Sequence, residues 1–259
     1  MDKFDLKNLN HNFLHRAQKI SRFNVSDKDF QSTDLKSELQ FLYASHIFPA
    51  FDWTKTLKGD TLSSSNVSEL NRLIRKLRNE SLTGFNELFK FKADSFGPGE
   101  VLIYILHDKV HLAGSGESGD IRIGSNKKIE LKACDKKVGT NEYFGFYLGG
   151  SFNTSDIVSR LFALKKKVGT AASASHEVGR TDITNMYEAE PETMKKIDED
   201  YAKIAYDNYF SKYPMMFIAN KKIGSAQMGD ILEIKNVKPK DIKIDALTSQ
   251  KIKPFIKAS

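Results

Sequence analysis

The chain has 259 residues, of which 40% are hydrophobic and 28% are charged, as is typical of a globular protein with a sizeable core. Its formal net charge of +7 fits a polyanionic partner such as nucleic acid. Cys134 is the single cysteine, which excludes an internal disulfide and favours a reducing, cytoplasmic compartment. Neither a signal-peptide core nor an apolar run near the ~20 residues of a membrane span is present, so we expect no membrane contact.

The first part of the chain, residues 1–92, predicts a helical N-terminal region packed on the rest. Residues 27–48 mix apolar and charged positions without strand alternation, and Pro49 ends that predicted helix. Asn66 and Glu69 form a predicted capping box. Apolar residues then recur at helical spacing (Leu70, Leu73, Ile74 and Leu77), and the basic residues between them indicate either a solvated face or one that follows phosphates.

A predicted α/β core occupies residues 93–225. A short helix is expected from Pro98 to Asp108, because proline is favoured just inside a helix start. Alternating polar and apolar residues at 120–123 and 127–133 predict a β-hairpin. Further predictions are a helix over 153–167 that Gly169 ends, a mobile loop from Gly169 to Tyr187, a helix over 191–213, and strands at 215–219, 231–235 and 242–246. Residues 226–259 are then a β-rich C-terminal extension.

The register of the predicted hairpin follows from its side-chain alternation. A two-residue turn would place Arg122 across from Ile129 and mix polar with apolar faces. A three-residue loop, residues 124–126, instead pairs Arg122 with Lys128 and Asp120 with Glu130. Two carboxylates about 5 Å apart at Cβ repel each other unless a cation bridges them or one is protonated. The register therefore indicates a site for a divalent metal.

The residues beside this acid pair suit phosphoryl chemistry. Lys132 lies two residues beyond Glu130 on the same face, where an ammonium group can act on an attacking water or stabilise charge on a phosphorane. The carboxylate ligands Asp120 and Glu130 favour Mg²⁺ or Mn²⁺ over zinc, and the backbone carbonyl of Leu131 is a candidate for a further ligand. A bound metal would activate water and steady the leaving oxygen.

An Asp on one strand followed by Glu-x-Lys on its hairpin partner resembles the PD-(D/E)xK nuclease superfamily, although Gly119 replaces the motif's proline. The resemblance covers residues 95–220, and 97–132 is similar to nucleases encoded by tailed bacteriophages. It implies a restriction-endonuclease-like core, with a central mixed sheet flanked by helices. It also implies that Glu100 is an accessory acid and metal ligand, next to Asp120, Glu130 and Lys132.

Several readings stay open at this point. Glu100 is equally explained as a first-turn carboxylate favoured by the helix dipole. A less favoured alternative is that Asp120 is a turn-entry residue and that Glu130 and Lys132 belong to an exposed strand face. The candidate nucleic-acid contacts are Lys127, Lys128, Lys136, Lys137 and Arg180. The leading hypothesis is a Mg²⁺-dependent deoxyribonuclease acting on DNA, double-stranded DNA being favoured, with a homodimer as an open possibility. The alternatives are a catalytically silent nucleic-acid-binding or phage structural protein and a sequence-specific restriction enzyme.

Overall fold

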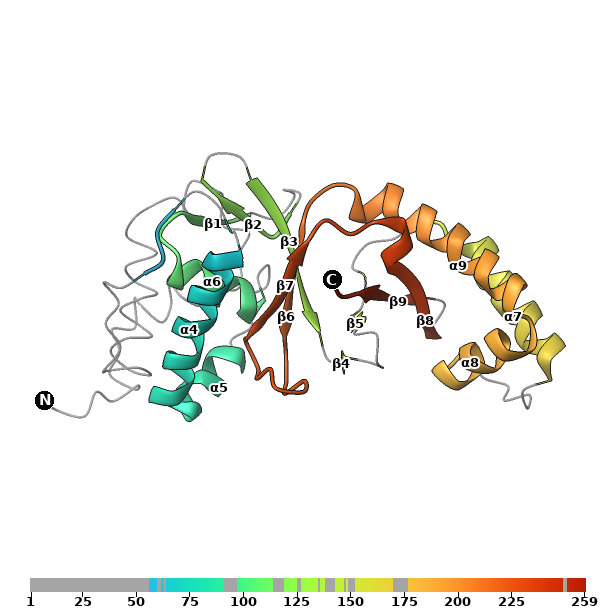
Figure 1. Ribbon diagram of the computed structural model, residues 1–259, viewed down its shortest axis with the longest axis horizontal. Helices are drawn as coiled ribbons and strands as arrows, with labels where there is room; N and C mark the ends of the chain where they lie inside the picture. The colour runs from blue at the N-terminus through green and yellow to red at the C-terminus, as the bar shows by residue number, and fades with distance from the viewer. Residues whose placement is uncertain are drawn as a thin grey trace, which may run out of the picture. The chain divides into compact units, whose positions relative to one another are not determined.

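The computed structural model describes residues 56–59, 62, 64–90, 97–113, 119–124, 127–134, 136–137, 143–146, 148, 152–169, 177–248 and 251–259. The predicted helix over 27–48 lies outside these residues. By their contacts the residues form two compact units, drawn in Figure 1. Unit 1 comprises Met1–Leu131 and Met228–Ile234, and unit 2 comprises Lys132–Gln227 and Lys235–Ser259. The predicted boundaries near residues 92 and 225 stay predictions.

Three helices in unit 1 contact one another: α4 (Ser64–Glu80), α5 (Leu82–Lys90) and α6 (Pro98–Leu106). The predicted apolar positions of α4 are buried, but α4 begins at Ser64. Asn66 is therefore inside the helix, and the prediction that it caps the helix is wrong. Residues 101–106 of α6 are all buried, as expected for a helix that is hydrophobic around its whole circumference.

The strands of unit 1 form an antiparallel meander. It consists of β1 (Val110–Leu112), β2 (Ile121–Ile123) and the first part of β3 (Lys127–Cys134). In β1 and β2 the central residue is half-buried between two buried neighbours, so each strand has one polar and one apolar face. The helix α6 packs on β1, and this contact covers part of the meander.

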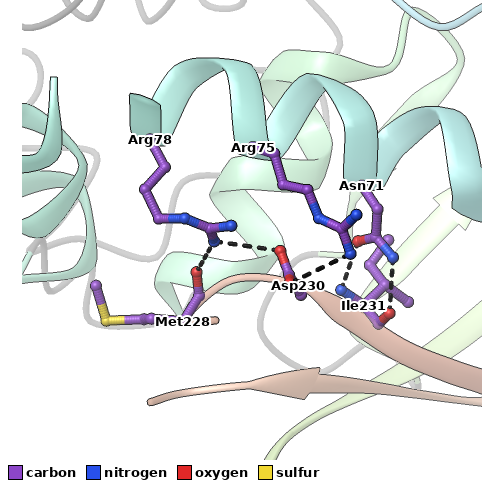
Figure 2. Close-up of polar contacts among 6 residues, drawn as sticks. All are labelled: Asn71, Arg75, Arg78, Met228, Asp230 and Ile231. Atoms are coloured by element: carbon purple, nitrogen blue, oxygen red, sulfur yellow. Dashed lines mark hydrogen bonds and ion pairs between the residues drawn. The ribbon is translucent and has the colours of Figure 1, made fainter. Parts of the chain in front are cut away.

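Polar contacts join α4 to the residues that lead into β7 (Ile231–Lys235), as Figure 2 shows. The side chain of Asn71 exchanges two hydrogen bonds with the backbone of Ile231, 2.7 Å and 2.9 Å long. Arg78 donates to the carbonyl of Met228 at 2.8 Å and pairs with the buried Asp230 at 3.2 Å. These contacts fix residues 228–231 against a helix that precedes them by about 150 positions.

Unit 2 contains its own helices and a second sheet. The helices α7 (Ser155–Val168), α8 (Arg180–Ala189) and α9 (Pro191–Ala205) contact one another, and a π-helix, Tyr206–Phe210, follows α9 directly. The second sheet has the order β4-β5-β9-β8, from Lys136–Lys137, Tyr143–Gly145, Lys251–Lys257 and Ile242–Thr248. Phe144, Phe146 and Phe210 are buried with Phe217 of β6 (Met215–Ala219), and their rings are in contact.

Two sequence predictions fail in unit 2. The predicted mobile loop from Gly169 to Tyr187 contains most of α8, which buries Ile183 and Met186. The predicted helix over 191–213 changes to π geometry after Ala205, where the N–H of Ser211 bonds to the carbonyl of Tyr206. The α7 helix is confirmed, and Gly169 at its C-terminal end has the left-handed conformation expected of a terminating glycine.

The fold class is confirmed as mixed α/β. The larger sheet has five strands in the order β1-β2-β3-β6-β7, and helices flank it. The chain order of α6, then the meander β1–β2–β3, then α7 to α9, then β6, matches the predicted succession of helix, strands, helix and strand.

Candidate active site

The register of the β2–β3 hairpin matches the predicted pairing of Arg122 with Lys128 and of Ile123 with Lys127, whereas the predicted pair Asp120–Glu130 is not part of the ladder. Arg122 lies opposite Lys128, and Ile123 opposite Lys127, so the connection has three residues. Its first residue, Gly124, has a φ of +58°, a conformation that glycine adopts without strain. The polar residues of both strands therefore share one face of the hairpin.

Asp120 lies immediately before β2 and is bonded to β3 and to the residue that follows β1. Its N–H donates to the carbonyl of Ile129 at 3.0 Å, and its carbonyl accepts from Ala113 at 3.0 Å. Its carboxylate oxygen Oδ2 accepts a hydrogen bond from the backbone N–H of Leu131 at 2.6 Å. The paired residues of β2 and β3 end at Ile121 and Ile129. Beyond this pair, the side chain of Asp120 bonds to the backbone of β3 at Leu131.

This contact places the Asp120 carboxylate at the edge of β3, next to the backbone of Leu131. Gly119, with a φ of +86°, brings the chain close to β3, and a Cβ there would lie 3.2 Å from the Cβ of Lys128. The N–H and C=O of one residue in an antiparallel strand point toward the same neighbour. We therefore expect the carbonyl of Leu131 to face the same strand edge as the Asp120 carboxylate.

Glu130 and Lys132 alternate along β3 with the buried residues Ile129 and Leu131, and both are half-buried. The Nζ of Lys132 lies 5.5 Å from the ring centroid of Tyr209, within the range of a cation–π interaction. The ring of Tyr209 in turn contacts the buried ring of Phe210 edge-on, with the centroids 5.2 Å apart. The π-helix thus presents an aromatic face to the candidate catalytic lysine.

Glu100 is the third residue of α6, and its side chain turns back toward the start of that helix. Its Oε1 lies 3.2 Å from the point where a Cβ on Gly97, the N-cap residue, would be. A carboxylate in this position interacts favourably with the positive end of the helix dipole. The structure thus gives Glu100 a local role, and its role as a metal ligand stays a prediction.

The donor set fits a hard divalent cation in its chemistry, because it combines the carboxylates of Asp120 and Glu130 with the carbonyl of Leu131. Within the described ranges, no group of three or more His, Cys, Asp or Glu side chains is arranged to hold a metal ion. Glu100 is therefore not gathered with Asp120 and Glu130 into such a group.

The predicted nucleic-acid contacts lie in different settings. Lys127 is exposed and Lys128 is half-buried opposite Arg122. Arg180, the first residue of α8, bonds to the buried Asp245 at 2.7 Å and stacks over the ring of Phe255 at 4.8 Å. These contacts give Arg180 a structural role in unit 2. The backbones of Lys136 and Lys137 form β4, but their side chains lie outside the described residues.

Two features near the site were missed from the sequence. His111 of β1 lies opposite Arg122, which lies opposite Lys128, so three basic residues occupy one row across the meander. The predicted hairpin register already paired Arg122 with Lys128. The pair His111–Arg122 could not be predicted, because β1 has three residues, too few for side-chain alternation to identify it as a strand. No sequence signal connects Tyr209 with Lys132, which lies 77 positions earlier in the chain.

Comparison with known proteins gives no match to a family model, to a curated protein or to a solved structure. Among the helices that the structure describes, none is both long and apolar enough to cross a membrane.

Proposed function

We propose that this chain is a metal-dependent nuclease that hydrolyses DNA phosphodiester bonds at the hairpin β2–β3. The observation that carries the proposal is the 2.6 Å hydrogen bond from the Leu131 N–H to the Asp120 carboxylate. It holds one acid at the strand edge where Glu130, Leu131 and Lys132 follow one another. The succession of helix, three-strand meander, helix and strand supports the resemblance to PD-(D/E)xK nucleases.

Each residue has a distinct part in the proposed reaction. Asp120, Glu130 and the Leu131 carbonyl would hold Mg²⁺ or Mn²⁺, which when bound supplies Lewis-acid stabilisation of the phosphoryl oxygens and an activated water. Lys132, on the same face as Glu130, would place its ammonium group against the oxygens of the phosphate undergoing attack. The ring of Tyr209 would limit the positions that this ammonium group can take.

A second candidate function rests on the same hydrogen bond. A buried backbone N–H left without a partner costs free energy, and β2 is too short to supply one for Leu131. The Asp120 carboxylate supplies that partner, which is a purely structural task. In that case the chain is a catalytically silent protein that binds nucleic acid or belongs to a phage assembly.

The test is cleavage of duplex DNA by the purified protein with Mg²⁺, with Mn²⁺ and with EDTA. The proposal expects metal-dependent nicking or degradation that Lys132→Ala abolishes without loss of folding, as judged by circular dichroism. Lys109→Ala is the matched control, because Lys109 is an exposed lysine outside the strands of the hairpin. Equal cleavage by the Lys132→Ala variant would rule out the assigned site, and salt-sensitive binding without cleavage would favour the second candidate.

A further inference from the structure

We propose that His111, Arg122 and Lys128 form a phosphate-binding row that holds the backbone of DNA beside the candidate active site. The inference deepens the proposed function and rests on it for the identity of the polyanion. It concerns binding rather than cleavage, so the two proposals can fail separately.

The row is defined by the register of three consecutive strands in unit 1. His111 of β1 is the Cα partner of Arg122 of β2, and Arg122 is the Cα partner of Lys128 of β3. His111 and Arg122 are each flanked by two buried residues, and all three members of the row are half-buried. Their side chains therefore emerge on the polar face of the meander, as do those of Glu130 and Lys132.

The chemistry of the row suits a phosphate group. Side chains directly opposite each other on neighbouring strands have their Cβ atoms about 4.5–5.5 Å apart, so one phosphate group can contact neighbouring members of the row. The guanidinium of Arg122 offers a planar fork that matches two phosphate oxygens, while Lys128 contributes a point charge and His111 a ring N–H.

The position of the row relative to the acids links it to the substrate. Lys128 and Glu130 are two residues apart on one face of β3, a rise of about 6.6–6.8 Å along the strand. A phosphate on the row thus lies about one strand repeat from the carboxylates of Asp120 and Glu130. The basic residues that would bind the DNA backbone thus lie next to the carboxylates that would hold a metal, and both groups come from the β2–β3 hairpin and β1.

The test is equilibrium binding of a fluorescein-labelled 20-bp DNA duplex in EDTA, followed by anisotropy over a range of salt concentrations. We expect Arg122→Gln and Lys128→Gln each to weaken binding roughly 5- to 20-fold near 0.1 M salt and to reduce the salt slope by about 1. Arg122→Lys, which keeps the charge and much of the side chain, should retain most of the affinity. Lys128→Gln provides the same test at a second strand if the Arg122 variant fails to fold.

Lys109→Gln is the matched control, because it removes the same charge from an exposed position that precedes β1 and lies outside the row. An equal loss of affinity in Lys109→Gln and Lys128→Gln would overturn the row, since attraction would then follow the net charge of +7 and not this face. Wild-type affinity in Lys128→Gln would overturn it as well. Row-dependent binding by a protein that cleaves no DNA would support the row and refute the nuclease.

Discussion

Two substitutions of Asp120 separate the hydrogen bond that this residue makes from the charge that it carries. Asp120→Ala removes both the carboxylate and the acceptor of the Leu131 N–H, whereas Asp120→Asn keeps an oxygen that can accept the same bond. The nuclease proposal needs the charge, because its site would hold the divalent cation through the carboxylates of Asp120 and Glu130. The structural alternative needs only the acceptor.

The magnitudes follow from the contact. A hydrogen bond to an ionised acceptor contributes about 1.5–3 kcal/mol, and the half-buried position of Asp120 favours the lower end. Leu131 is 7% exposed, so Asp120→Ala leaves its N–H poorly solvated and should lower the free energy of unfolding by about 2 kcal/mol. Asp120→Asn should lower it by about 0.5–1 kcal/mol, because the bond becomes one between neutral groups.

The assay pairs urea unfolding, followed by circular dichroism, with Mg²⁺-dependent cleavage of duplex DNA. We expect both variants to lose about 100-fold or more of the activity, because metal-assisted charge stabilisation contributes several kcal/mol to such reactions. Asp120→Asn should therefore be nearly as stable as the wild type and nearly inactive. An Asp120→Asn protein that cleaves at close to the wild-type rate would refute the assignment of Asp120 as a metal ligand.

Four further outcomes are expected. Asp230→Ala should lower the free energy of unfolding, measured with urea, by about 3 kcal/mol, because it leaves the mostly buried Arg78 without its ion-pair partner. In the same assay Arg75→Ala should change this free energy by less than about 0.5 kcal/mol, because the Arg75 side chain is 58% exposed. Gly229→Ala should destabilise the protein by about 2 kcal/mol or more in the same assay, because φ is +89° and the new Cβ would lie 2.7 Å from a buried phenylalanine ring. Burial raises the pKa of Asp198 in the folded protein, so the ionised carboxylate opposes folding. The unfolding temperature should therefore increase as the pH falls through this raised pKa toward about 4, the ordinary value for an aspartate, and Asp198→Asn should not show this increase. Tyr209→Leu should reduce the turnover number about 3- to 10-fold while Tyr209→Phe retains it, because only phenylalanine keeps an aromatic ring against Lys132. An unchanged turnover number in Tyr209→Leu would show that the ring of Tyr209 does not position Lys132.

The hairpin could be predicted because two constraints act together on a short segment. The alternation of Ile121, Ile123, Ile129 and Leu131 allows only registers that keep these residues on one side, and the loop length selects among them. The orientation of the Glu100 carboxylate was left open, because a first-turn acid can face its own helix end or a neighbouring strand. The structure turns it toward Gly97.

The elements that were missed depend on contacts that alternation does not encode. The helix α8 lies in a segment of small and polar residues, and the Asp182 side chain accepts a hydrogen bond from the Gly179 N–H at its start. The strand β9 contains Pro254, which normally argues against an inner strand. Pro254 pairs with Ile244 next to an irregularity in the β8–β9 register, where the regular ladder is already interrupted.

The fixed position of residues 228–231 against α4 has a consequence for how the chain is made. Unit 1 needs Met228–Ile234, which the ribosome adds after the whole of residues 132–227. At about 5–20 residues per second, those roughly 100 residues take about 5–20 s to synthesise. During that interval the partners of Asn71 and Arg78, which are the backbone carbonyls of Ile231 and Met228, have not yet been synthesised. The nascent chain therefore passes through a stage in which α4 has been synthesised and the residues that it binds in the finished unit have not.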